Sequence, residues 1–421
     1  MPNFPTATYL ARRSAIVVFL VFAVAYFFSS LIRAITATLS PILTQEFALS
    51  SRDLGLLAGG YFLGFAAVQL PLGGWLDRYG PKKVILCLLL VAVLSCLAFS
   101  FASSFSGLLA ARILSGVGVS ACLMAPLTGY RRWYHPSHLL RTNSWMLMTG
   151  SLGVVASTLP VQLLLPVVGW RVLFWGLAAM AMIAMALIAW QVPRWDVSLR
   201  PVTPAGPAPG GYAEVWKHPY FRKMAAIGFV NYGGFIAMQT LWTAPWLIKV
   251  AGYTPLQAAS GMFWINIAML LTFWAWGTVN PWLARRGLVA ERLIAWGLPA
   301  SFIFLAIIIT AGSDLSASSW KLWALYFVSC TFVSLAQPAV GMAFAPALAG
   351  RALSAYNLLI FVGIFAVQWG IGLALDGFKS LGLTEIQSFQ FSMGIFLLCS
   401  ILAYVHFLVA KSHNENVCPT S

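Results

Sequence analysis

The feature that most constrains this chain is a pair of long apolar runs joined by a short polar stretch. The runs cover residues 54–72 and 84–105, and the polar stretch is Gly73-Gly74-Trp75-Leu76-Asp77-Arg78-Tyr79-Gly80-Pro81-Lys82-Lys83. About 20 apolar residues let a helix cross a bilayer, and Gly80-Pro81 is typical of a tight turn. We therefore expect two antiparallel membrane helices. The cations of the polar stretch predict that it faces the cytoplasm.

Composition extends this interpretation to the whole chain. Sixty per cent of the 421 residues are hydrophobic, and only 8% are charged, whereas a soluble domain carries about a quarter charged residues. At roughly 20 residues for each crossing, the length accommodates about 12 helices. The expected fold class is an all-α membrane protein with twelve transmembrane helices.

The net charge of +15 does not indicate a nucleic-acid partner. Most of the 25 Lys and Arg residues fall in segments predicted to be cytoplasmic. This asymmetry is what the positive-inside rule predicts for a membrane protein, whose partner is the lipid bilayer. The cations predicted outside are Arg52, Arg171, Lys249, Lys321 and Lys379, and those within helices are Arg33 and Arg112.

The apolar runs divide into two sets of six, separated by a Pro- and Gly-rich linker. A cytoplasmic tail, 1–13, precedes the N-terminal half, 14–192, and the linker covers 193–223. The C-terminal half covers 224–410, and a second cytoplasmic tail covers 411–421. The predicted helices are 14–39 (ended by Pro41), 54–75, 83–105, 107–130, 142–166, 170–192, 224–248, 256–280, 290–311, 319–345, 352–376 and 387–410.

Two weak internal matches support a repeat of the first half in the second. Arg285 and Gly287 align with Arg78 and Gly80, and Ala284 replaces the acid of the first copy. The segment from Arg351 to Gly363 likewise aligns with the segment from Arg141 to Gly153. Two matches at nearly one offset favour the internal repeats that many transporter folds show.

The stretch 73–83 resembles the loop signature of the major facilitator superfamily, between its second and third helices. Arg112-x-x-x-Gly116-x-Gly118 is similar to the superfamily's fourth-helix motif. The resemblance covers about residues 14–410. It implies transport by alternating access, a central cavity lined by helices one, four, seven and ten, and a monomer.

The most informative residues are ionisable groups inside the predicted membrane segments, which are costly and usually functional. No carboxylate lies in the middle of a predicted helix, but Arg33 and Arg112 do lie within helices. If both approach the cavity, they favour an anionic ligand held by a planar fork. Alternatively, Arg33 reaches the outer surface or pairs with Glu46 or Asp53, and Arg112 has an interhelical or proton-relay role.

Uncharged polar residues complete the predicted binding set: Tyr26, Asn231, Gln239, Trp242, Gln337 and Asn357. Gln239, Trp242 and Trp246 recur at helical spacing and would share one face. Polar groups with aromatic walls suit a small-molecule site. The alternatives are interhelical hydrogen bonding and, favoured for Trp246, anchoring at the membrane interface.

A second set of residues is predicted to act in gating. The resemblance implies that Asp77 meets the cytoplasmic start of the eleventh helix, near Arg351. A carboxylate at a helix N-terminus is favourable, so this contact would hold the inner side closed. The alternative is that the loop charges only determine topology. The gating and loop residues are Gly73, Asp77, Arg78, Gly80, Lys82, Lys83, Arg285, Gly287 and Arg351.

We find no arrangement of residues that indicates catalysis, a cofactor or a metal site. The sequence therefore predicts a transporter of the cytoplasmic (inner) membrane. It would carry a small anionic or zwitterionic metabolite into the cell, with the coupling ion left open. One alternative is efflux of amphipathic compounds, and another is a non-transporting sensor or scaffold.

Overall fold

The computed structural model describes residues 9–193 and 211–410, which are almost entirely helical. The first group of helices is α1 (Arg12–Phe47), α2 (Ser51–Tyr79), α3 (Pro81–Phe101), α4 (Phe105–Val119), α5 (Ala121–Trp133), α6 (Pro136–Ala156) and α7 (Leu159–Gln191). The second group begins with α8 (Tyr212–Lys217), α9 (Pro219–Ala226), η2 (Ile227–Tyr232), α10 (Gly233–Ala237), η3 (Met238–Trp242) and α11 (Thr243–Lys249). It continues with α12 (Pro255–Arg285), α13 (Ala290–Ala311), η4 (Gly312–Ser318), α14 (Ser319–Cys330), η5 (Thr331–Leu335), α15 (Ala336–Met342), α16 (Pro346–Ser380) and α17 (Glu385–Val409).

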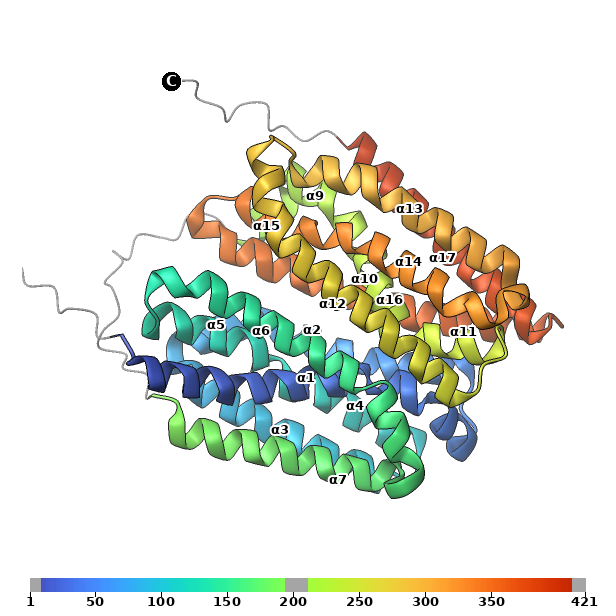
Figure 1. Cartoon of the computed structure of the whole chain (residues 1–421), viewed down its shortest axis with the longest axis horizontal. Helices are drawn as coiled ribbons and strands as arrows, with labels where there is room; N and C mark the ends of the chain where they lie inside the picture. The colour runs from blue at the N-terminus through green and yellow to red at the C-terminus, as the bar shows by residue number, and fades with distance from the viewer. Residues whose placement is uncertain (1–8, 194–210, 411–421) are drawn as a thin grey trace, which may run out of the picture.

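The helices form two bundles that lie side by side (Figure 1). The bundle coloured blue to green contains α1–α7, and the bundle coloured yellow-green to red contains α9–α17. Among the described residues, eleven helical spans are long and apolar enough to cross a membrane. The helix α6 is not among them, although it runs beside α1 (Figure 1). Counting α6, the observed bundle agrees with the expected twelve-helix architecture.

Several predicted boundaries need correction. Pro41 does not end the first helix, because α1 continues to Phe47. The hydroxyl of Ser40 donates to the carbonyl of Ala37 at 2.8 Å, which satisfies the acceptor that Pro41, lacking an N–H, leaves free. The fourth span is divided between α4 and α5 around Ser120. The predicted linker lies largely outside the described residues, but its last part, from Tyr212, is helical.

The polar stretch at 73–83 is mostly helical rather than a loop. The helix α2 extends to Tyr79, and α3 begins at Pro81. Only Gly80 separates them, with φ +79° and ψ 160°. A positive φ strains any residue with a Cβ, so this turn requires glycine. Pro81 is well placed at the first position of α3, where a missing N–H costs nothing.

The internal repeat predicted from sequence is visible in the backbone. Gly287, aligned with Gly80, also has a positive φ, +74°. Gly153 lies against the backbone of Phe27 in α1, and Gly363 lies against the backbone of Phe229 in η2. In both cases a Cβ would overlap the carbonyl oxygen of that phenylalanine. In each half, therefore, one glycine lets a helix pack directly on the backbone of the first span of that half.

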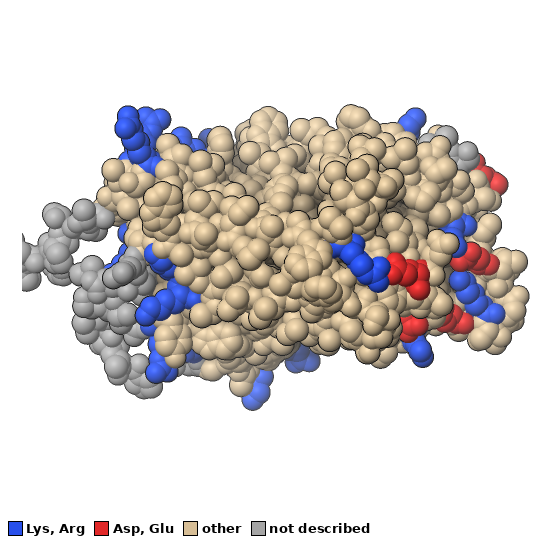
Figure 2. Space-filling view, turned by 90° about the horizontal axis from the view of Figure 1, so that it is seen from below, with Lys and Arg blue, Asp and Glu red and all other residues tan. Residues whose placement is uncertain are grey.

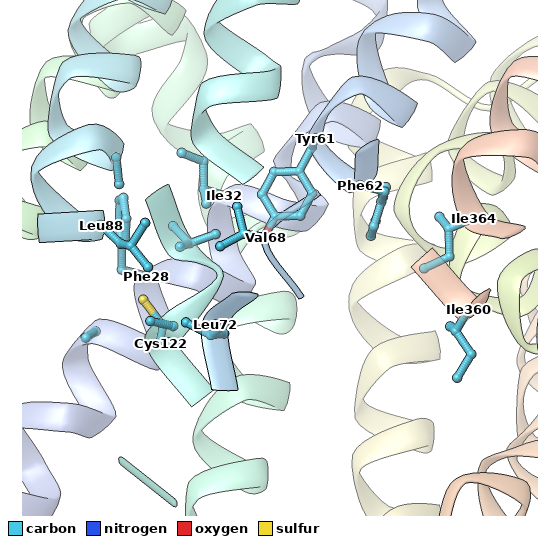
Figure 3. Packing of buried hydrophobic residues seen from close by; sticks show 14 of the residues in the cluster. Phe28, Ile32, Tyr61, Phe62, Val68, Leu72, Leu88, Cys122, Ile360 and Ile364 are labelled. Carbon is cyan, nitrogen blue, oxygen red and sulfur yellow. The ribbon is translucent and has the colours of Figure 1, made fainter. Parts of the chain in front are cut away.

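The two bundles meet along α2 and α16. Phe62 and Phe65 of α2 pack on Phe361, with ring centroids 6.2 and 4.3 Å away. Figure 3 shows Phe62 on the side of Ile360 and Ile364, whereas its neighbour Tyr61 lies towards Ile32. Adjacent residues of α2 thus serve the interface between the halves and the core of the first half.

Acidic side chains distinguish the two ends of the molecule's long axis on the face shown in Figure 2. On the face shown in Figure 2, Asp and Glu lie at one end, and Lys and Arg lie at both ends. The acidic end carries the end of α1, the start of α2, the end of α16 and the start of α17, with Glu46, Asp53, Asp376 and Glu385. The opposite, basic end carries the turn after α2 and the connection between α5 and α6, with Lys82, Lys83, Arg131 and Arg132.

Candidate functional site

Arg33 lies at the boundary between the two halves. Its guanidinium interacts electrostatically with Tyr26 of α1, Tyr61 of α2 and Tyr232 of η2. The residue is half-buried, and its Nε is buried without a hydrogen-bond partner among the described residues. We call Arg33 and these three tyrosines the arginine–tyrosine cluster. A cation with an unused donor and three phenol groups within electrostatic range can hold an oxyanion by charge-assisted hydrogen bonds.

The acids proposed as alternative partners of Arg33 have other contacts. Glu46 accepts a hydrogen bond from Trp170 Nε1 at 2.7 Å and pairs with Arg171 at 2.6 Å. Asp53 accepts from the backbone N–H of Ser50 at 3.3 Å. Both carboxylates therefore serve helix ends at the acidic end of the molecule.

Arg112 lies beside Tyr61 of the arginine–tyrosine cluster and is almost completely buried, with 1% of its surface exposed. Its Nη1 donates to the carbonyl of Ile32 at 2.9 Å, and its guanidinium lies over the ring of Tyr61, 5.2 Å from the centroid. Gly116, one turn later, lies against the backbone of Tyr61. In this conformation Arg112 links α4 to α1 and α2, while its Nε and Nη2 are buried without hydrogen-bond partners among the described residues.

The polar residues of the seventh span make hydrogen bonds within the second half. Asn231 donates to the carbonyl of Ser400 at 3.2 Å, and Gln239 donates to Asn266 Oδ1 at 2.8 Å. Trp242 Nε1 donates to the carbonyl of Gln368 at 3.1 Å. Trp242 and Trp246 both pack on Phe389, with ring centroids 6.4 and 6.1 Å away, whereas Gln239 bonds to Asn266, and the predicted binding role of this set stays a prediction.

The other predicted aromatic and amide residues have structural partners too. Trp246 is fully buried against Trp323, 6.1 Å between ring centroids, so it is not a membrane-interface anchor. Gln337 donates to Asn357 Oδ1 at 2.5 Å, which ties α15 to α16. Tyr26 packs against Gly150 of α6, where a Cβ would overlap its ring. Of the predicted binding residues, only Tyr26 belongs with Arg33 to the arginine–tyrosine cluster.

Sequence reasoning did not select Tyr61, which the structure places between Arg33 and Arg112. Its hydroxyl donates to the carbonyl of Ser29 at 3.4 Å. The available signal was local: Tyr61 is the one hydroxyl-bearing side chain within the apolar run 54–72. A polar group in such a segment needs a partner.

The loop residues have separate roles at the basic end. Lys82 Nζ donates to the carbonyl of Val192 at 2.7 Å, which caps the end of α7. Lys83 and Arg285 are exposed, and Arg78 lies over the ring of Tyr79. A Cβ on Gly73 would meet nothing within 4 Å, so no close packing requires this glycine here. The contact of Asp77, which is exposed, with the start of α16 near Arg351 stays a prediction.

The fold is similar to that of solved transporters. A bacterial homologue of the human lysosomal transporter Spinster, in an inward-facing and unoccupied conformation, superposes with a TM-score of 0.79. The match covers 95% of this chain and 98% of that chain at 16% sequence identity. At this identity the likeness establishes the fold alone.

Curated relatives match over parts of their length. A probable sulfoacetate transporter of Cupriavidus necator is 24% identical over 248 residues, 56% of this chain and 57% of that protein. A niacin transporter of Acinetobacter baylyi is 28% identical over 155 residues, 35% of this chain and 34% of that protein. The family model of the Major Facilitator Superfamily matches residues 22–368. Because this model covers most of its length, the chain belongs to the Major Facilitator Superfamily.

Proposed function

We propose that this protein carries a small anionic or zwitterionic solute across the cytoplasmic membrane by alternating access, and that Arg33 binds the solute. The observation that carries the proposal is the position of Arg33. It is a half-buried cation with a buried, unpartnered Nε at the boundary between the halves. Transporters of this fold bind cargo near the middle of the membrane, between the two repeats.

The tyrosines help to determine which chemical groups of a solute the arginine–tyrosine cluster could bind. A carboxylate or sulfonate could accept two N–H bonds from the guanidinium fork and further O–H bonds from Tyr26 or Tyr232. Since Tyr232 belongs to the second half and the other residues to the first, one bound solute would contact both bundles. Binding would then favour particular relative positions of the halves, as alternating access requires.

The relatives support a charged cargo. Sulfoacetate carries a sulfonate and a carboxylate, and niacin carries a carboxylate beside a pyridine nitrogen. The basic end of the molecule would face the cytoplasm by the positive-inside rule, with both termini on that side. We further propose that transport is uptake and that the protein works as a monomer.

The test is a thermal-shift screen of the purified protein with anionic, zwitterionic and neutral solutes. The panel includes niacin and its neutral amide, which differ in charge but share a ring. A ligand at 100 times its Kd stabilises the folded state by about 2.7 kcal/mol. We expect anions to raise the melting temperature of the wild type and the response to disappear in Arg33→Gln.

The matched control is Arg52→Gln, which removes the same charge from an exposed side chain at the acidic end. This variant should respond like the wild type. An equal response to the amide, or a full response from Arg33→Gln, would show that Arg33 does not bind the cargo. A screen in which only amphipathic neutral solutes register would favour efflux of such compounds.

A further inference from the structure

The two halves are joined at the acidic end by a carboxylate on a helix N-terminus. Asp376, near the end of α16, accepts hydrogen bonds from two consecutive backbone N–H groups of α2. Its Oδ1 is 3.1 Å from the nitrogen of Ser51, and its Oδ2 is 2.8 Å from the nitrogen of Arg52. Such a bond to an ionised acceptor is about twice as strong as a neutral one.

The first turn of α2 leaves these two donors available for the other half. Ser50 and Asp53 form a capping box, in which Ser50 Oγ accepts from the N–H of Asp53 and the Asp53 carboxylate accepts from the N–H of Ser50. A helix start has four N–H groups without partners inside the helix. The capping box satisfies two groups within the first half, and Asp376 satisfies two others from the second half.

Glycines let α2 and α16 approach closely enough for Asp376 to reach the N–H groups of α2. A Cβ on Gly372, one turn before Asp376, would overlap the carbonyl oxygen of Ser51. A Cβ on Gly55, one turn after Ser51, would overlap the carbonyl oxygen of Gln368. The backbones of α2 and α16 therefore touch over two successive turns, which end at the carboxylate.

We propose that Asp376 and the N-terminus of α2 form a latch that holds the acidic end of the transporter closed. The latch comprises Asp376, Gly372 and Gln368 of α16 with Ser51, Arg52 and Gly55 of α2. It is the reverse of the contact predicted at the basic end, where Asp77 near the end of α2 would meet the start of α16. Opening the acidic end must break both hydrogen bonds to Asp376 and expose two N–H groups.

The proposal rests on alternating access, but its test needs no cargo. Spin labels are attached at Gln45→Cys and Ser380→Cys, which are exposed positions at the ends of α1 and α16. Cys87 and Cys399, which are exposed, and Cys418, which lies outside the described residues, are replaced by Ser so that only the two introduced cysteines are labelled. Electron–electron distance measurements then give the ratio of open to closed molecules at the acidic end.

We expect Asp376→Ala to raise the ratio of open to closed molecules about tenfold, which corresponds to about 1.4 kcal/mol. Glu385→Gln is the matched control, since this acid lies at the same end but pairs with Lys249 and Lys379 of its own half. Asp53→Asn is the second control, because it weakens the capping box without removing a contact between the halves. Neither control should change the ratio.

Two variants test the latch from its other components, in case Asp376→Ala does not fold. Ser51→Pro removes one of the two donors, while proline at the first helical position remains compatible with the helix. Gly372→Ala adds a methyl group where the backbones touch, and Gly370→Ala, with nothing within 4 Å of its Cβ, is its control. Both test variants should increase the open fraction, and Gly370→Ala should not.

The latch would be overturned if the folded variants kept the wild-type ratio, or if Glu385→Gln opened the acidic end as much as Asp376→Ala. These results are independent of the cargo screen. A failure of the Arg33 experiment with a positive latch result would reject the proposed cargo and leave the latch in place.

Discussion

The first helix and the seventh span occupy equivalent positions in the two halves, yet they are built differently. The helix α1 is one continuous α-helix of 36 residues. Its counterpart, Pro219–Lys249, is interrupted by the π-helical stretches η2 and η3. The charged group lies on the regular helix, at Arg33, whereas the interrupted span carries the uncharged residues Asn231, Gln239 and Trp242.

The partners of these residues explain the difference. Asn231, Gln239 and Trp242 each donate to an acceptor in the second half, so they stabilise that bundle. The buried Nε of Arg33 has no such partner in the part of the chain that the structure describes. Under the proposed function, the first half supplies the charge that binds the cargo, while these three residues of the second half serve its internal packing.

The substitutions with the largest expected effects on stability test the glycine contact that α1 and the seventh span have in common. Gly153→Ala and Gly363→Ala each place a Cβ on the carbonyl oxygen of Phe27 or Phe229. Each should lower the free energy of unfolding by ~3 kcal/mol through overpacking, measured as melting temperature in detergent. Gly176→Ala and Gly394→Ala are the controls, since a Cβ there would meet nothing within 4 Å. A large loss in one half only would contradict the equivalence.

A substitution with a moderate expected effect on stability distinguishes polar residues that stabilise the fold from a residue that binds the ligand. Gln239→Leu leaves Asn266 Oδ1 buried without its donor, which should cost ~1–2 kcal/mol of stability and leave the response to anions unchanged. Replacing both residues by Leu should recover part of the loss. Arg33→Gln should show the opposite pattern, with retained stability and no anion response. Loss of anion binding in Gln239→Leu would place the site in the second half as well.

The smallest expected effect concerns the continuity of α1. Ser40→Ala removes the hydroxyl that donates to Ala37 and should cost ~1 kcal/mol. The double variant Ser40→Ala/Pro41→Ala restores a backbone N–H at position 41 and should regain the loss. Chemical or thermal unfolding of both variants checks this, and equal stability of the two variants would show that the Ser40 bond does not compensate for Pro41.

Structural features that depend on residues close together in the sequence were predictable. The turn at Gly80 and its counterpart at Gly287 follow from the motif and the repeat, because a positive φ depends on the residue itself. The twelve apolar runs follow from composition. The continuation of α1 past Pro41 was missed because its compensation comes from the side chain of Ser40, which propensity alone does not reveal.

Features that depend on long-range pairing were not predictable. Asp376 lies at the end of a predicted helix, and nothing near it in the sequence indicates its partners Ser51 and Arg52, which lie more than 300 residues earlier. The partners of Gln239 and Asn231 depend on how η2 and η3 turn those side chains, and no sequence period shows a π-helix. Arg33 could be selected because an unpaired cation in an apolar run is conspicuous by itself.

The π-helical stretches also affect how the specificity of this protein can be changed. A ladder of i→i+5 bonds holds one more residue in each turn than the i→i+4 ladder of an α-helix. Removing a single residue from η2 or η3 would therefore let that stretch close into a regular α-helix and rotate the side chains that follow it in the span. For this span, a one-codon deletion would therefore change many side-chain positions at once, which no single substitution does.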